Sequence, residues 1–406
     1  MYIQRKIETR LLKNLERDET IVLVGPRQSG KTTMLRHLKK ILEKRENITF
    51  FINLEKKSFL NLLNEDPENL FKLTGNLPER KVYVIIDEIQ YLDDPSNFLK
   101  YIYDEYAPRI KLIVSGSSAF YIDQKFKDSL SGRKRLLSLM TLDFREFLEF
   151  KGYGEMTELF TEIPLLKKRE IPKLQADQLN RLFLEFMRFG AFPRVVLEKD
   201  EEEKIYLLDE LLTSYLAKDV EAMGIRKKDK FYALLRILAM QVGNLLNQSE
   251  LANTLRISVT AVEKYLYILE KSFQVKIITP FFLNLRKELT RMPKLYFLDT
   301  GIRNILLDNF DFPEFRMDKG IYWENLVFKL LHDRRDLKSI NFWRTQDKNE
   351  VDFILNKKFA LEVKFNGDKF FLSRYKQFIK SYPGIPIRAA SFVNPKPDHL
   401  TFFDLV

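Results

Sequence analysis

The sequence predicts an α/β protein of several domains, with a parallel β-sheet in its first 150 residues. At 406 residues the chain is too long for one ordinary hydrophobic core. Apolar, β-branched runs near residues 21–24, 48–53, 82–86 and 110–115 alternate with segments of helical period. This alternation is typical of a parallel sheet flanked by helices, because parallel neighbours need a crossover connection.

The composition limits the class of protein. Apolar residues make up 45% of the chain and charged residues 31%, which is typical of a globular protein. The chain has no cysteine, which excludes disulfides and thiolate metal sites and fits a reducing cytoplasm. No apolar stretch is long enough for a signal peptide or a membrane span, so we expect a soluble cytoplasmic protein with no membrane partner. The net charge of +11 suits nucleic acid, and a lysine-rich solvated surface explains it as well.

The segment "TIVLVGPRQSGKTTMLRHL" predicts a strand, a glycine-bracketed loop and a helix. In such a P-loop the backbone N–H groups and the helix N-terminus hold phosphates. Lys31 would reach the β- and γ-phosphates and act in catalysis, and Thr32 would ligate Mg²⁺. The predicted ATP-binding residues here are Gly25, Pro26, Arg27, Gln28, Ser29, Gly30, Lys31, Thr32 and Thr33.

A second nucleotide element follows in "KVYVIIDEIQYL", an apolar strand that ends in two acids. Asp87 at the strand tip would hold Mg²⁺, and Glu88 would polarise the attacking water. The adjacent acids favour an ATPase over a GTPase, and no N-K-x-D element that would read guanine is visible.

Two further polar residues are candidates for contact with the γ-phosphate. Ser117, or its neighbour Ser118, follows the strand in "RIKLIVSGSSAF" and would sense the phosphate, although a simple turn fits equally well. Arg133 follows Gly132 in "LSGRKR" and would supply charge in the transition state, within one chain or toward a neighbouring subunit of a homo-oligomer. A solvated basic loop is the alternative for Arg133.

Together, "GPRQSGKTT", "IIDEIQ", "SGSS" and "LSGR" resemble the AAA-type P-loop ATPases of archaea and bacteria. The resemblance is to the additional-strand-glutamate division, near the signalling ATPases called STAND, and implies a sensor strand between the P-loop and Walker B strands. It continues through "RFGAFPRVV", "LLTSYLAKDV" and "PKLYFLDTGIRN". The implied order is an ATPase core (1–150), a helical lid (151–228), a winged helix (229–315) and a restriction-endonuclease-like, PD-(D/E)XK, domain (316–406).

Residues 229–315 themselves show the pattern of a winged helix. We expect Ser249 and Ser258 to cap successive helices, and the basic residues Arg286, Lys287 and Arg291 to lie in the wing and contact phosphates. In the second helix Val259, Val262, Leu266 and Leu269 would face inward, and Thr260, Glu263, Lys264 and Tyr267 outward. DNA is therefore the expected partner; a protein partner is the alternative, because Glu263 repels phosphate.

Near the C-terminus, "NEVDFILNKKFALEVKF" predicts a β-hairpin. Strand alternation puts Ala360, Glu362 and Lys364 on one face and Phe359, Leu361, Val363 and Phe365 on the core face. Asp352 would join the acid side, with Glu324 from the preceding amphipathic helix. Glu324, Asp352 and Glu362 would hold Mg²⁺ or Mn²⁺, and Asp352, Glu362 and Lys364 would be catalytic in a nuclease-like site. The alternative is a salt-bridge ladder on an inactive nuclease fold.

Three functions remain open from the sequence. The first is an ATPase whose nucleotide state controls the access of DNA to a metal-dependent nuclease site. The second is a DNA motor or clamp with an inactive nuclease fold, and the third is an ATP switch that binds a protein partner.

Overall fold

The computed structural model describes residues 2–75, 79–116, 130–160, 164, 167–220, 224–282 and 292–406. These residues form two compact units: Met1–Thr141 with Lys271–Phe273, and Leu142–Glu270 with Gln274–Val406. The first break lies close to the predicted end of the ATPase core. Within the described ranges, no helix is long and apolar enough to cross a membrane.

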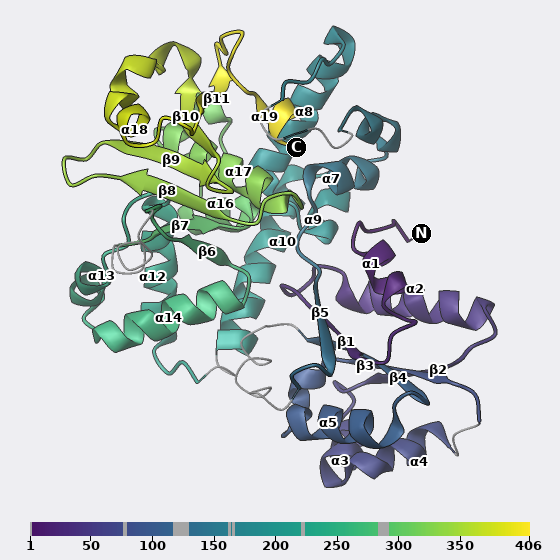
Figure 1. Ribbon diagram of the computed structural model, residues 1–406. Coiled ribbons are helices and arrows are strands. Elements are labelled where there is room, and N and C mark those ends of the chain that lie inside the picture. The colour runs from purple at the N-terminus through teal and green to yellow at the C-terminus, as the bar shows by residue number, and fades with distance from the viewer. Residues whose placement is uncertain are drawn as a thin grey trace. The chain divides into compact units, whose positions relative to one another are not determined.

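The first unit is built on a five-stranded parallel sheet in the order β2-β3-β4-β1-β5 (Figure 1). The four predicted strands are present, and the fifth, β5, was not expected. Strand β4, which follows Walker B in the chain, lies between the P-loop strand β1 and the Walker B strand β3, as the resemblance implied. The strands are β1 Thr20–Val24, β2 Ile48–Asn53, β3 Val82–Asp87, β4 Ile110–Gly116 and β5 Lys134–Ser138.

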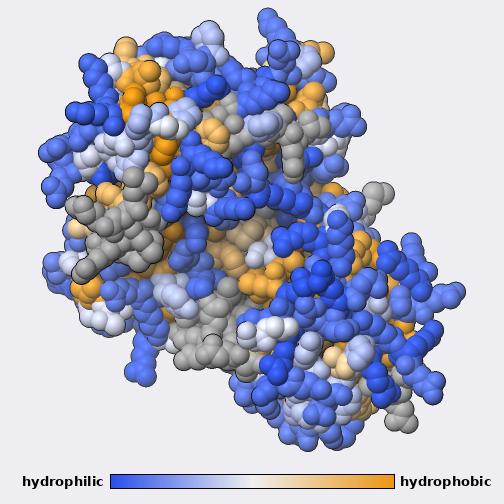
Figure 2. Space-filling view, viewed as in Figure 1, coloured by the Kyte–Doolittle hydropathy of each residue, from blue (hydrophilic) through white to orange (hydrophobic). Residues whose placement is uncertain are grey.

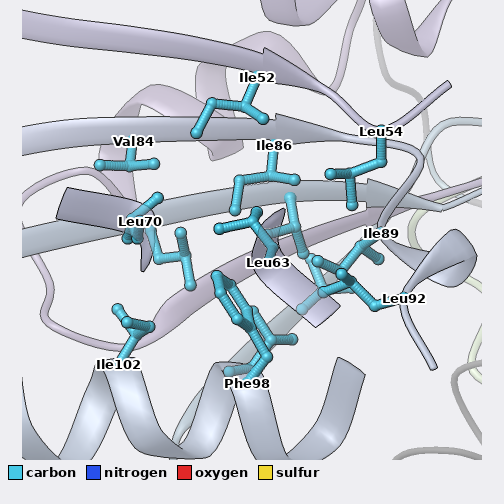
Figure 3. Close-up of a cluster of buried hydrophobic side chains, with 14 of the residues drawn as sticks. Ile52, Leu54, Leu63, Leu70, Val84, Ile86, Ile89, Leu92, Phe98 and Ile102 are labelled. Atoms are coloured by element: carbon cyan, nitrogen blue, oxygen red, sulfur yellow. The ribbon is translucent and has the colours of Figure 1, made fainter. Parts of the chain in front are cut away.

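Both faces of this sheet are buried, because each central strand is apolar at odd and even positions. Val22, Val84 and Ile86 pack with Phe98 and other residues of the helices on one face (Figure 3). The other face of β1, β3 and β4 packs against the apolar stripe of α2 and against α1. The described helices of this unit are α1 Glu8–Lys13, α2 Lys31–Lys44, α3 Lys57–Glu65, α4 Leu70–Thr74 and α5 Pro95–Tyr106.

The second unit begins with a group of helices, and the sequence predicted a helical lid in this part of the chain. Gly190 ends α8 with φ +72° and Pro193 begins α9, so these two residues mark the turn expected from the sequence. The described helices of this part are α7 Phe144–Phe150, α8 Lys173–Phe189, α9 Pro193–Leu197 and α10 Glu201–Ser214, followed by a π-helical turn at Tyr215–Asp219.

A buried carboxylate explains two of the sequence motifs. Asp299, at the N-cap of α16 (Thr300–Leu307), accepts hydrogen bonds from the backbone N–H groups of Gly301 and Ile302, at 2.9 and 3.3 Å. Its second oxygen accepts the N–H of Ala191 at 2.9 Å. A Cβ at Gly190 would lie 2.1 Å from an Asp299 oxygen, so the "FGAFP" and "LDTGIRN" segments fit each other only with glycine at position 190.

Three helices and a hairpin follow in the part of the chain predicted to be a winged helix: α12 Lys228–Met240, α13 Gln248–Leu255, α14 Val259–Lys271, and the antiparallel pair β6 Val275–Ile278 and β7 Lys294–Phe297. Ser258 caps α14 as expected, through the N–H of Ala261 at 3.1 Å. The cap of α13 is Asn247, not Ser249, because Asn247 accepts the N–H of Glu250.

The face of α14 that turns outward is close to the prediction. Thr260, Glu263, Lys264 and Tyr267 are exposed, whereas Val262, Leu266 and Leu269 are buried. Val259, expected to face inward, is 40% exposed, because it begins the helix and lies beyond the packed turns. The basic wing residues Arg286, Lys287 and Arg291 lie outside the described residues.

The C-terminal part is a four-stranded mixed sheet in the order β11-β10-β9-β8 (Figure 1). Its hairpin pairs Phe353 of β9 with Leu361 of β10, and β11 runs parallel to β10. In the chain, α17 precedes β8 and the hairpin, and α18 follows the hairpin. The bounds are α17 Lys319–Asp333, β8 Ile340–Arg344, β9 Glu350–Leu355, β10 Phe359–Asn366, α18 Lys376–Ser381, β11 Ile387–Val393 and α19 Phe402–Leu405.

The strict alternation predicted for this hairpin is wrong, because β9 contains a bulge. Against β8, Ile354 pairs with Asn341 and Val351 with Trp343, so β9 has one extra residue between the pairs. Val351 therefore packs in the same cluster as Ile354 and Ala360. The face that carries Ala360 is thus a core face too, and the sheet is buried on both sides.

We predict that Gly190→Ala lowers the free energy of unfolding of the second unit by about 2–4 kcal/mol, from the left-handed φ and the displaced Asp299 cap. The matched control is Gly152→Ala, at φ +82° with no atom within 4 Å of the new Cβ, for which we expect about 1 kcal/mol. Urea unfolding would measure both variants. Equal losses would show that the contact with Asp299 has no energetic weight.

Candidate functional site

The P-loop backbone curves around the side chain of Lys31. Gln28 and Gly30 both have positive φ (57° and 97°), which turns the loop so that successive N–H groups can face one ligand. A Cβ at Gly25 would lie 2.0 Å from the carbonyl oxygen of Leu139, so only glycine fits at the start of the loop. The Lys31 ammonium donates to the carbonyl oxygens of Gly25 and Pro26, at 3.0 and 2.8 Å.

The two acids at the end of β3 take different positions. Asp87 is fully buried and accepts a hydrogen bond from the hydroxyl of Ser115 on the neighbouring strand β4. Its second oxygen, Oδ2, is buried and has no hydrogen-bond partner among the described residues. Glu88 has a left-handed backbone (φ 62°), and its N–H donates to the Ser115 oxygen at 3.1 Å.

This geometry separates the roles of the two acids. Burial raises the pKa of Glu88, and the nearby Lys31 ammonium and the hydrogen bond from Gln90 oppose the rise. A carboxyl with a raised pKa is a better proton acceptor than an ordinary carboxylate. Asp87 lies at the end of its strand and has one oxygen without a hydrogen-bond partner among the described residues. It is suited to a cation, since Mg²⁺ takes oxygen ligands.

The residues named from sequence for ATP and Mg²⁺ mostly lie at one edge of the sheet. The loop of residues 25–33 continues from the end of β1. Asp87 ends β3, two strands away, and Glu88 follows it. Thr32 is half-buried in the first turn of α2, and the Oγ of Ser29 is buried without a partner among the described residues. The buried oxygens of Ser29 and Asp87, which have no hydrogen-bond partner among the described residues, fit a bound Mg²⁺–nucleotide, which Thr32 and Asp87 would hold.

Two residues of this site were not found from the sequence. Ser115 links both acids, although the prediction chose Ser117, which lies outside the described residues. Arg5, only 5% exposed, donates to the carbonyl oxygens of Ser29 in the loop and Met140 after β5, each at 2.9 Å. Ser115 lies within the end of a strand, and Arg5 is far from the loop in the sequence. Neither residue is therefore part of a recognisable motif.

Arg133 does not join this site within its own chain. Its carbonyl accepts the N–H of Thr20 at the start of β1. Arg133 therefore lies at the N-terminal ends of the strands, whereas the P-loop lies at their C-terminal ends. Its side chain pairs with Asp104 at 2.6 Å. A role toward the nucleotide of the same chain is therefore excluded by geometry, and a role toward a neighbouring subunit stays a prediction.

The C-terminal candidates are brought close together. Asp352, at the bulge of β9, accepts the N–H of Val363 on β10 at 2.7 Å and donates its own N–H to Glu362 at 3.4 Å. Lys364 pairs with Glu362, which also accepts a hydrogen bond from the Tyr375 hydroxyl. The carboxylate of Glu324, on α17, lies within electrostatic range of Asp352.

The metal centre at Glu324, Asp352 and Glu362 stays a prediction. Among the residues that the structure describes, no three or more acidic or histidine side chains are grouped so that they could hold a metal ion. Some of the carboxylate oxygens have partners within the protein: Asp352 accepts the Val363 N–H, and Glu362 pairs with Lys364 and accepts a hydrogen bond from Tyr375. Glu324 is paired elsewhere.

The partner of Glu324 is a lysine that the sequence did not indicate. Lys294 of β7 is 1% exposed, and its ammonium lies 3.6 Å from Glu324 and pairs more closely with Glu350, which Arg344 also contacts. Tyr296, two residues further along β7, donates its hydroxyl to Glu324 at 2.7 Å.

The charges of this cluster shift one another's pKa. Burial and the nearby Asp352 raise the pKa of Glu324 to about 7, against the pull of Lys294 and Tyr296. Burial and Asp352 likewise raise the pKa of Glu362 to about 8. Burial alone would lower the pKa of Lys294, but Glu324, Asp352 and Glu350 outweigh it, and the net direction is upward.

Comparison with known proteins finds family models for three segments of the chain. Residues 17–148 match the family model of the AAA domain, and residues 180–312 and 319–402 match two domains of unknown function, DUF8612 and DUF4143. The first part of the chain is therefore an AAA-type P-loop ATPase domain, and the C-terminal part is a DUF4143 domain.

Among curated proteins, the chain is similar to the uncharacterized protein MJ1544 of Methanocaldococcus jannaschii, with 28% identity over 361 residues, which cover 87% of this chain and 75% of the relative. It is also similar to Rv2008c of Mycobacterium tuberculosis, likewise uncharacterized, with 26% identity over 371 residues that cover 90% and 74%. Among solved structures, it has a TM-score of 0.34 and 16% identity with the Holliday junction branch migration motor RuvB of Thermotoga maritima, over 71% of this chain and 95% of that one.

The raised pKa of Glu362 predicts how stability depends on pH. Because the pKa is about 8 in the folded chain and 4.5 for an ordinary glutamate, the folded state binds the extra proton between these values. Its contribution to the free energy of unfolding is full below pH 4.5 and is lost as the pH rises toward 8.

We therefore expect chelator-treated protein to lose stability from pH 5 to pH 8, and Glu362→Gln to lose less of it over that range. Urea unfolding at several pH values measures this, with the exposed Glu263→Gln as control. Parallel curves for wild type and Glu362→Gln would contradict the assignment.

Proposed function

We propose that this protein is a Mg²⁺-dependent ATPase. The observation that carries the proposal is the pair of acids at the end of β3, one buried with an open oxygen and one aimed by a left-handed backbone. Lys31 would bind the β- and γ-phosphates in place of its present bonds to the loop carbonyls. Mg²⁺ held by Thr32 and Asp87 would supply positive charge to the phosphate oxygens.

Glu88 would accept the proton of the attacking water. The Ser115 hydroxyl fixes the N–H of Glu88 and one oxygen of Asp87, so it holds the two acids in their separate roles. Ser115 is thus a positioning residue, and a change there should act through Asp87 and Glu88.

Glu88→Gln should reduce ATP hydrolysis by about 10²-fold or more and leave ATP binding intact, because only the proton acceptor is lost. Lys31→Ala should abolish hydrolysis and weaken ATP binding. Phosphate release and ATP binding would be measured on the full chain, with Lys39→Ala as control, since Lys39 lies on the same helix and pairs with Glu43 at the surface. Wild-type turnover by Glu88→Gln would remove the proposed base.

We further propose that the second unit binds DNA and does not cleave it. The net charge of +11 belongs to the whole chain and suits a polyanionic partner. The surface visible in Figure 2 is largely hydrophilic. The outward face of α14 carries Lys264 with Thr260 and Tyr267, beside the acidic Glu263. The exposed basic residues Arg226, Lys227 and Lys228 precede or begin α12. The paired charges at the C-terminal acids argue against a cleavage centre, so the DNA clamp is favoured over the nuclease.

Lys264→Glu should weaken binding to duplex DNA about tenfold and reduce its salt dependence, because one phosphate contact would be lost and replaced by repulsion. The control is Lys39→Glu on α2 of the first unit. Fluorescence anisotropy at several salt concentrations measures affinity, and the same DNA is scored for cuts with Mg²⁺ or Mn²⁺. Cleavage that Glu362→Gln abolishes would restore the nuclease, and affinity unchanged by Lys264→Glu would remove α14 from the interface.

A further inference from the structure

The acid cluster of the C-terminal sheet contains cations of its own: Lys364 pairs with Glu362, Arg344 with Glu350, and Lys294 with Glu350 and Glu324. Four carboxylates, those of Glu324, Glu350, Asp352 and Glu362, lie near one another there; Asp352 and Glu362 are buried, and Glu324 and Glu350 are half-buried. Left alone, such a group would be strongly unfavourable, because like charges repel and buried charges lose hydration. A divalent ion is one remedy, and a buried lysine is another.

Lys294 meets the requirements of a built-in counter-ion. Its side chain is 1% exposed, so its ammonium has almost no contact with water. The ammonium lies 3.6 Å from Glu324 and pairs with Glu350, and it also acts electrostatically on Asp352. Of the three acids predicted to hold a metal ion, Lys294 thus acts on Glu324 and Asp352, whereas Glu362 pairs with Lys364.

The backbone around Lys294 fixes its position. β7 pairs with β6 on one side, and Lys294 forms a bridge with Leu245 on the other. Tyr296 of the same strand stacks on Phe328 of α17 at 4.5 Å between ring centroids and bonds Glu324. Gly243, near that bridge, leaves room for the Glu324 carboxylate, since a Cβ there would lie 2.6 Å from its oxygen.

The cluster also crosses a boundary between families. Lys294 and Tyr296 belong to the segment that matches DUF8612, and the four carboxylates belong to the segment that matches DUF4143. The acids of the C-terminal domain are therefore completed by a strand from the preceding one.

We infer that Lys294 is the resting counter-ion of Glu324 and Asp352 in place of a divalent metal ion, and that its ion pairs with Glu324 and Glu350 join strand β7 to the C-terminal domain. Lys294 and a metal ion would compete for the same carboxylate oxygens. This inference does not depend on ATP hydrolysis or on DNA binding, because it concerns only the occupancy of the cluster.

The test compares Mn²⁺ binding and thermal unfolding of the nucleotide-free full chain, with Mn²⁺ alone as the probe. We expect wild type to show no Mn²⁺ binding that Glu324→Gln removes, and no Mn²⁺-induced rise in Tm. Lys294→Met should lower Tm, gain Mn²⁺ binding, and recover part of its Tm when Mn²⁺ is added. Both gains should disappear in Lys294→Met combined with Glu324→Gln.

Two results would overturn the inference. One is wild-type protein whose Mn²⁺ binding and Tm rise are lost in Glu324→Gln or Asp352→Asn, which would make the metal the resting cation. The other is Lys294→Met with wild-type Tm. If Lys294→Met does not fold, the wild-type arm still decides, and Lys294→Met with Glu350→Gln should fold better because both partners of one ion pair are removed.

Discussion

The second unit depends on one constraint, that a charge taken out of water must find a partner. Its core contains several such charges. Asp299 is satisfied by three backbone N–H groups, and Arg303 and Arg316 share the carboxylate of Asp318. Lys294 is enclosed by acids. Breaking a buried pair costs about 3–5 kcal/mol, so each pair fixes how its segments are placed.

These pairs connect segments that are far apart in the chain. Asp299 joins the end of α8 to the start of α16, and Asn304 of α16 donates to the carbonyl of Arg188 at 2.8 Å. Arg316 donates a hydrogen bond to the carbonyl oxygen of Asn309. Its guanidinium also lies over the ring of Tyr322, which belongs to α17. These polar contacts thus link helices α8, α16 and α17 of the second unit.

The sequence could predict the first unit well, and the reason is local. Runs such as residues 82–86 are apolar at every position, which indicates a strand buried on both faces, and the P-loop is recognised by glycines in a fixed order. β5 was missed because "KRLLS" is short and mixed in polarity. Arg133 was placed by a motif alone, and its distance from the P-loop follows from the pairing of β5 with β1.

The C-terminal site was only partly predictable. The acids and Lys364 were found by alternation, but the bulge in β9 breaks alternation through one extra residue that no side chain signals. Lys294 was missed because its partners, Glu324 and Glu350, come from later elements of the chain. Patterns of short range reveal the elements, whereas ion pairs between elements need the tertiary structure.

The two polar sites of the chain differ in one physical respect that bears on function. In the ATPase domain an Asp87 oxygen and the Ser29 hydroxyl are buried and have no partner among the described residues, a cost that a bound ligand would remove. In the C-terminal cluster each of the four carboxylates has an ion-pair or hydrogen-bond partner within the protein. A site with unpaired hydrogen-bond acceptors favours the binding of a ligand, and a site whose carboxylates are paired within the protein favours a fixed structure. This contrast supports catalysis at the P-loop and a structural role for the C-terminal acids.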